Sequence, residues 1–215
     1  MKQSLLIVTL AAMGLLFTGC ATNRGIVDIR IPASSNPSLG PKVYVSEVKD
    51  LRKFELKPAS ADIPSLRNGE INDPSITSRA VARKRNGYGK ALGDILLPEG
   101  RTVVDLVKES TENALRERGY IVLDRAEADA LPLKVNIHKF WSWVRMGFWT
   151  LELNFEGVVS LDNEAVCLHP NQKVQGKMAL KTQAATTRAW KNILNQGLDE
   201  LGVQITANLK VADGN

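Results

Sequence analysis

The sequence predicts an α+β fold in which a mainly antiparallel sheet is covered on one face by two amphipathic helices. Two segments carry apolar residues at helical spacing, and several shorter segments alternate apolar and polar residues as half-buried strands do. The predicted order is strand, long irregular insert, helix, strand, hairpin, strand and helix. Strand runs interrupted by only two helices are typical of α+β folds rather than of regularly alternating α/β folds.

The first twenty residues have the layout of an export signal. Lys2 is followed by an apolar run over 5–17, which is too short to span a membrane as a helix, and then by the tripeptide TGC that ends at Cys20. Small residues directly before a cysteine resemble the bacterial lipobox, which implies that Cys20 carries diacylglycerol and becomes the acylated first residue. We therefore expect a lipoprotein signal peptide over 1–19. A plain signal peptide or a short anchor helix is the alternative.

Composition and charge describe an ordinary globular protein with a mild positive balance. The 215 residues are 44% hydrophobic and include 28 Lys and Arg against 23 Asp and Glu, a net charge of +5. Removal of 1–19 takes away only Lys2 and leaves a net charge of +4. A dedicated nucleic-acid binder is far more basic, so we expect no nucleic-acid partner. With Cys20 acylated, Cys167 has no disulfide partner and is expected to be a small buried hydrophobe.

After the cysteine, the chain divides into a tether, one folded unit and a short tail. Residues 20–40 are rich in Pro, Ser, Asn and Gly and predict a tether, within which 26–31 could form a short strand. A single α+β domain is expected over 41–211 and a fraying tail over 212–215. The first clear strand covers 42–49. The insert over 50–100 then has no sustained period, and we expect short helices and extended pieces that lie over the domain.

Two helices follow from the spacing of apolar residues. The first is predicted over 103–118, with a capping box from Thr102 to Asp105 and a left-handed stop at Gly119. A strand over 120–123 comes next. The last predicted strand covers 173–182, and it precedes the second helix. That helix carries the longest apolar stripe in the chain, formed by Trp190, Ile193, Leu194, Gly197, Leu198, Leu201, Ile205 and Leu209.

Between the helices lies a predicted hairpin in which one set of apolar residues has odd numbers in both arms, over 131–143 and 149–161, while Phe140 and Phe148 fall on the opposite face. Opposed residues share a face, so two odd-numbered partners require a turn with an odd number of residues. A three-residue turn over 145–147 meets this condition and places Trp143 opposite Trp149. The same register places His138 opposite Asn154, with Glu152 as its diagonal neighbour on the polar face.

The tryptophans Trp141, Trp143 and Trp149 lie in this hairpin. The predicted alternation puts all three on the face that carries the aliphatic residues, so burial in the core is the leading interpretation. Their clustering near one end of the hairpin leaves an exposed aromatic shelf as the alternative. Such a shelf could meet a lipid interface, a glycan or a partner protein.

Taken together, the lipobox, the helix that ends in "RGY", the following "YIVL" strand, the hairpin and the long C-terminal helix resemble the YajG-like bacterial envelope lipoproteins. The resemblance covers about 101–210 and includes the short motif "RGYIV". The insert over 50–100 departs from the family's layout. The resemblance implies a small envelope accessory protein and supplies no catalytic residues.

Motifs for catalysis or metal binding are missing from the sequence. It contains no HExxH, CxxC, GxSxG or EF-hand spacing, so we expect no metal, no cofactor and no enzymatic activity. The glycine-rich segment 87–94 lacks the spacing of a phosphate-binding loop. One alternative is a glycan- or lipid-modifying enzyme built on the carboxylates Glu47, Asp50, Asp94 and Glu99. Another is a carrier for a lipid or small molecule, which would need an apolar pocket between helix and sheet.

A basic run over 79–90 contains no acidic residue. A solvated face is the usual explanation of such a run, and the functional alternative is a surface that binds lipid headgroups, an acidic glycan or an acidic partner segment. The candidate anion-binding or partner-binding residues are Arg79, Arg83, Lys84, Arg85 and Lys90.

The sequence thus predicts a lipoprotein anchored through Cys20 on the periplasmic face of the bacterial envelope. Ala21, rather than an aspartate, follows the cysteine, which favours the outer over the inner membrane. The expected role is non-catalytic binding or scaffolding, with an envelope protein as partner. The expected contact surfaces are the insert over 50–100, the basic run over 79–90 and the aromatic end of the hairpin.

Overall fold

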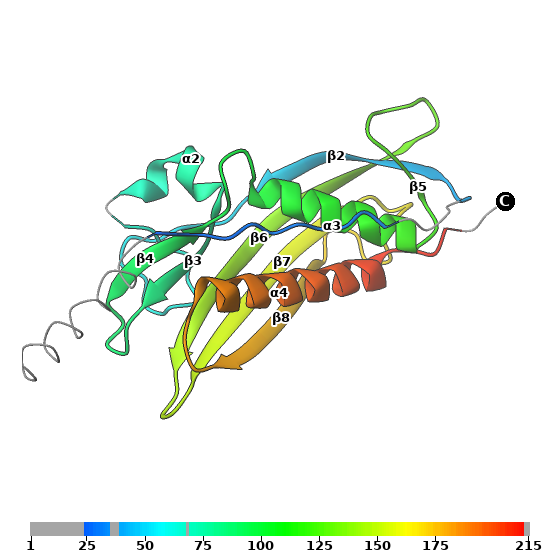
Figure 1. Cartoon of the computed structure of the whole chain (residues 1–215). Coiled ribbons are helices and arrows are strands. Elements are labelled where there is room, and N and C mark those ends of the chain that lie inside the picture. Colours follow the sequence, from blue (N-terminus) through cyan, green and yellow to red (C-terminus); the bar gives the residue numbers. More distant parts are fainter. Residues whose placement is uncertain (1–23, 35–38, 68, 213–215) are drawn as a thin grey trace, which may run out of the picture.

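Strand β6 (Leu131–Met146) is the centre of an eight-stranded mixed sheet (Figure 1). On one edge it pairs antiparallel with β7 (Leu151–Asp162), which pairs antiparallel with β8 (Lys173–Thr182). On its other edge it pairs parallel with β2 (Lys42–Asp50) and, further along, with β3 (Ala80–Arg85). The sheet continues with β5 (Ile121–Leu123) beside β2, β4 (Ala91–Leu96) beside β3, and β1 (Gly25–Ile26) beside β4. The fold class is α+β as predicted, and the parallel pairings were not foreseen.

The computed structural model describes residues 24–34, 39–67 and 69–212. Cys20, the signal peptide and the first part of the predicted tether lie outside the described residues. The helices within the described residues are η1 (Glu70–Asn72), α2 (Pro74–Thr77), α3 (Val103–Glu117) and α4 (Thr187–Asn208).

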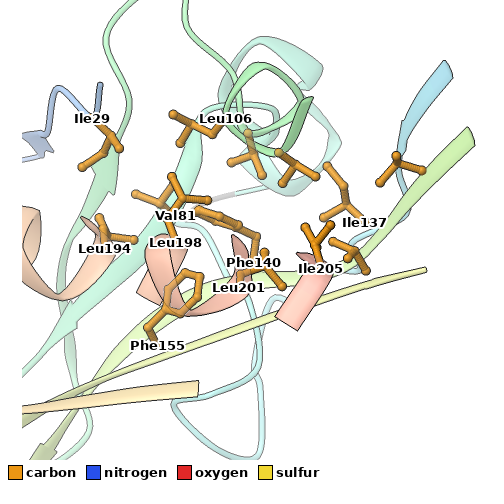
Figure 2. Packing of buried hydrophobic residues seen from close by; sticks show 14 of the residues in the cluster. Ile29, Val81, Leu106, Ile137, Phe140, Phe155, Leu194, Leu198, Leu201 and Ile205 are labelled. Atoms are coloured by element: carbon orange, nitrogen blue, oxygen red, sulfur yellow. The ribbon is translucent and has the colours of Figure 1, made fainter. Parts of the chain in front are cut away.

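Helices α3 and α4 lie side by side on one face of the sheet and enclose the main core with it (Figure 1). The predicted capping box of α3 is present, because Asp105 N–H donates to the Thr102 hydroxyl while the Asp105 carboxylate accepts from Thr102 N–H. Gly119 follows with a φ of 91°, the predicted left-handed stop. Figure 2 shows the core between α4 and the sheet, where the rings of Phe140 and Phe155 meet edge to face at 5.0 Å.

The insert over 50–100 is folded onto the domain. Its last part supplies β3 and β4 of the sheet, and the preceding part, with η1 and α2, covers the sheet face away from α3 and α4. A second apolar cluster lies under this cover. It consists of Leu66, Ala80, Leu96, Trp141 and Trp143, with Phe54, Ala61, Ile71 and Ile76 packed against it. The expectation of short helices and extended pieces over the domain is therefore confirmed.

The predicted register of the hairpin is wrong. Trp143 pairs with Asn154 rather than with Trp149, and Met146 pairs with Leu151 across a four-residue turn over 147–150. There are two causes. The turn lies farther along the chain than predicted, so that Ile137 pairs with Val159 rather than with Phe155, and a β-bulge in β6 at His138 then shifts the pairing with β7 by one further residue. The bulge exchanges the two faces of the second half of the strand.

Before the bulge, odd-numbered residues face the main core, among them Val135 and Ile137. After it, the even-numbered Phe140 and Val144 face that core, and the odd-numbered tryptophans turn to the opposite face. Strand β7 has no such shift along its ladder with β8, so its odd-numbered apolar residues stay on the main core throughout. After the bulge the sequence numbers of two paired residues therefore add up to an odd number. Such a register requires a turn with an even number of residues, here four.

Residues 24–34, which composition assigned to the tether, are part of the folded unit. Gly25 and Ile26 pair with Ile95 and Leu96 of β4, while Val27 and Ile29 are fully buried against the main core (Figure 1, blue). The following residues are fixed to α3, because the Asn113 side-chain amide donates to the Pro32 carbonyl at 2.8 Å.

Candidate functional site

Two of the three candidate aromatic residues are structural. Trp141 and Trp143 lie under the insert with exposed fractions of 0% and 8%. The Trp141 indole N–H donates to the Ala61 carbonyl at 3.2 Å, and its ring meets Phe54 edge to face at 5.9 Å. The ammonium of Lys139 lies 5.4 Å from the centroid of the Trp143 ring. The contacts of Trp141 with Ala61 and Phe54 hold the insert on the sheet, whereas Lys139 and Trp143 both belong to β6.

The basic run over 79–90 does not form one open surface. Arg79 donates to the Leu97 carbonyl at 3.0 Å, and Arg85 donates to the Ser65 hydroxyl at 3.1 Å and to the Gly89 carbonyl at 2.9 Å. Lys84 is half-buried, and Lys90 is exposed. Arg79 and Arg85 thus contact groups of the fold itself, and so does Arg83, which lies 3.4 Å from Asp94.

Arg83 belongs to a buried charge cluster around Asp94. The Asp94 carboxylate is 1% exposed and lies 3.4 Å from Nε of Arg83 and 3.5 Å from Nη2 of Arg24. Arg24 also donates to Glu70 at 2.5 Å. Burial raises the pKa of Asp94, and the two guanidinium groups act in the opposite direction. The cluster joins the start of β1, the insert and β4, which is a structural role.

The carboxylates considered for catalysis either pair with basic side chains of the fold or lie alone on the surface. Both oxygens of Asp50 accept from the guanidinium of Arg52, and Asp94 is enclosed in the cluster above. Glu47 lies 3.1 Å from the ammonium of Lys49 on the same strand, while Glu99 is exposed in the loop before α3.

His138 and Cys167 are the remaining groups that could carry chemistry. Nε2 of His138 lies 2.9 Å from the Ser160 hydroxyl, not beside Asn154 or Glu152 as predicted, because the ladder before the bulge pairs Ile137 with Val159 rather than with Phe155. Ser160 is 4% exposed, so its hydroxyl is not presented to a substrate. Burial lowers the pKa of His138, and it raises the pKa of the Cys167 thiol to about 11. A buried protonated thiol is a poor nucleophile.

Exposed aromatic residues gather at one end of the molecule instead. The turn between β6 and β7 presents Phe148 and Trp149, which are 90% and 82% exposed, and the turn between β3 and β4 presents Tyr88, which is 98% exposed. Met146 is 44% exposed beside them. Trp149 was a predicted candidate and Tyr88 was not, because the only signal of Tyr88 is its place between two glycines.

The two turns lie at the same end because of the strand directions. β3 runs parallel to β6, with Ala82 opposite Ser142, so both strands end side by side. Thr182 at the end of β8 pairs with Leu151 at the start of β7, which brings the loop before α4 to this end too. Figure 1 shows both turns pointing the same way. We define the hairpin end as residues 84–90, 145–152 and 181–188.

Hydrogen bonds hold both turns in place. Gly147 N–H donates to the Thr150 carbonyl at 2.8 Å. The Asn86 side-chain oxygen accepts from the backbone N–H groups of Tyr88 and Lys90 at 3.0 and 2.9 Å. The rings of Phe148 and Trp149 meet edge to face at 4.8 Å. The aromatic side chains are therefore presented from ordered turns.

The hairpin end is also strongly basic. Its 23 residues include the single acid Glu152. The basic residues are Lys84, Arg85, Lys90, Arg145, Lys181 and Arg188. The predicted positive surface thus exists in part, but the tertiary structure assembles it from three segments rather than from the run over 79–90.

An apolar pocket opens at the same end, on the face that carries α4. Its volume is about 320 Å³, and it is lined in part by Leu92, Val144, Met146, Leu151 and Trp190. Trp190 is fully buried, and its indole nitrogen has no hydrogen-bond partner. Pockets of this size with mostly apolar walls are typical of small-ligand sites.

Within the described residues, no group of three or more His, Cys, Asp and Glu side chains is placed to hold a metal ion. Across 24–34, 39–67 and 69–212, no helix is long and apolar enough to cross a membrane.

Comparisons with known proteins assign no family to this chain. No protein-family model matches it, and no curated protein does. One similar solved structure is a crystal structure of an uncharacterised protein, with 10% identity and a TM-score of 0.40, covering 87% of this chain and 97% of that one. Another is a Xanthomonas campestris protein described by the family name DUF330, with 13% identity and a TM-score of 0.42, covering 85% of this chain and 91% of that one.

Proposed function

We propose that this chain is a lipid-anchored protein of the bacterial cell envelope that acts non-catalytically, as a binding or scaffolding component. Cys20 carries the anchor and the folded domain faces the periplasm, on the outer rather than the inner membrane. The hairpin end is its contact surface for another envelope component.

The observation that carries this proposal is the exposure of Tyr88, Phe148 and Trp149 on ordered turns at one basic end. Large aromatic side chains are costly to leave in water, and patches of them mark interaction sites. Two of the contact surfaces that the sequence predicted are open only in part. The apolar side chains of the insert pack on Trp141 and Trp143, and the arginines of the basic run bind groups of the fold.

A carrier for a small apolar ligand is the second candidate function, favoured by the pocket between α4 and the sheet. Its apolar lining and the unpaired indole N–H of Trp190 support it. The pocket opens at the hairpin end, so both candidates use the same region of the molecule. A carboxylate enzyme has no comparable support.

Two measurements on the full-length protein in its host test the main proposal. Mass spectrometry is expected to find a mature chain that starts at Cys20 and carries acyl groups. A photo-crosslinking residue at position 148 is expected to form adducts with envelope lipid or protein. The control is the same residue at Val203, which is 59% exposed on α4 and about 24 Å along the helix from its start.

An unmodified amino terminus upstream of Cys20 would contradict the proposal. Equal adduct yields at positions 148 and 203 would show that the hairpin end is not a contact surface.

A further inference from the structure

We infer that the hairpin end is a membrane-docking surface, which enters the interface of the same bilayer that holds the lipid on Cys20. The aromatic side chains of Tyr88, Phe148 and Trp149 would lie at headgroup depth, and the exposed basic side chains of Lys90, Arg145, Lys181 and Arg188 would contact lipid phosphates. The inference rests on the proposed function, because it takes the anchor on Cys20 as given, and it names the partner of the hairpin end.

The direction of β1 shows from which side the chain enters the sheet. β1 runs parallel to β4, with Gly25 opposite Ile95, and β4 begins at the turn that carries Tyr88. The chain that enters β1 therefore arrives from the side of the hairpin end. Only three residues lie between Cys20 and Arg24, a span of at most about 14 Å over four peptide units. An acylated Cys20 therefore allows the hairpin end to reach the bilayer surface.

The side chains at this end are those that membrane interfaces favour. Trp and Tyr are enriched at headgroup level, because their rings are apolar and each has one polar group that stays hydrated. Trp149 and Tyr88 are the two most exposed residues of these types among the described part of the chain, and Phe148 lies against Trp149. They sit on two separate turns, so they can enter an interface together without unfolding either one.

Charge favours the same partner. The hairpin end has six basic residues and one acidic residue, whereas the whole chain has 28 basic and 23 acidic residues. The net charge of the hairpin end, +5, therefore equals the net charge of the whole chain. Arginine and lysine bind lipid phosphates, and a positive surface is drawn to an anionic leaflet. A protein partner or a second copy of the chain would need its own acidic surface to match this end.

Fluorescence of the full-length acylated protein in vesicles tests the inference. The vesicles contain phosphatidylethanolamine and phosphatidylglycerol, with bromine on the acyl chains in one set and none in the other. Trp141, Trp143 and Trp190 are buried, so Trp149 is the tryptophan open to quenching. Bromolipid is expected to remove most of the Trp149 emission and to leave the emission of W149F nearly unchanged. Iodide in the aqueous phase is expected to quench Trp149 weakly.

Other results would overturn the inference in distinguishable ways. Equal Trp149 emission in both vesicle sets, together with strong quenching by iodide, would show that the hairpin end points away from the bilayer into the aqueous phase. No effect of bromolipid together with weak iodide quenching would show that a second copy covers it. Both results leave the proposed function standing if mass spectrometry finds acylated Cys20. An unmodified Cys20 would refute both proposals.

Discussion

Replacing Arg52 by methionine is expected to lower the free energy of unfolding by about 3–5 kcal/mol. Arg52 lies in the gap on one edge of β6, between the end of β2 and the start of β3. Its guanidinium group is fully buried, donates to the Ala80 carbonyl at 2.6 Å and to the Thr77 carbonyl at 2.7 Å, and binds both oxygens of Asp50. It also reaches the Phe140 carbonyl at 3.4 Å. One side chain thus joins β2, β3 and β6.

The magnitude follows from the groups that the substitution leaves behind. Methionine fills most of the volume, but the carbonyls of Ala80 and Thr77 lose a charged donor, and each such loss costs about 1–3 kcal/mol. Asp50 is 23% exposed and can regain water, so its share is smaller. The avoided cost of burying a guanidinium offsets part of the total. Lysine at position 52 keeps the charge but cannot reach all these acceptors at once, so its effect should be intermediate.

Urea unfolding followed by circular dichroism measures this loss, provided that the transition is two-state. For a domain of this size, 3–5 kcal/mol corresponds to a fall in Tm of roughly 6–20 °C. The control is the exposed Arg125, whose replacement by methionine should change stability by less than about 0.5 kcal/mol. A loss below about 1 kcal/mol for Arg52→Met would refute the view that Arg52 holds the three strands together.

Two further predictions concern the packing of α4 and the buried thiol. Gly197→Ala should destabilise the protein by about 1–3 kcal/mol, because a Cβ at this position would overlap the ring of Phe155. Alanine is the better helix former, so an increased urea midpoint would contradict this prediction. Cys167 should react with an alkylating reagent at pH 8 far more slowly in the folded protein than after unfolding, because burial raises its thiol pKa to about 11 and thiolate is the reactive form; equal rates would show that the thiol is accessible.

The helices and the last strand were predictable because their signals are local. The helix predicted over 103–118 is α3 (Val103–Glu117), and the strand predicted over 173–182 is β8 (Lys173–Thr182). Cap residues and apolar spacing act over one or two turns of chain, so they can be found without any knowledge of distant contacts. The parallel pairing of β2 with β6 depends on residues that are more than 80 positions apart and carries no such signal.

The register of the hairpin failed for a related reason. The odd-numbered apolar residues Leu131 to Ile137, with Trp141 and Trp143, look like one strand face, but Lys139 and Phe140 interrupt the alternation where the bulge at His138 splits it into two faces. Both faces are apolar here because the insert covers the second one. Sequence alternation alone could not distinguish one buried face from two.

By itself, the sequence determined the α+β class and the positions of α3, α4 and β8, and it predicts an export signal before Cys20. Only the tertiary structure decided which aromatic residues stay in water and which basic residues remain available. Trp143 and Trp149 are six positions apart, yet one lies under the insert and the other at the tip of a turn. Exposure depends on what distant segments cover, and local composition does not encode that.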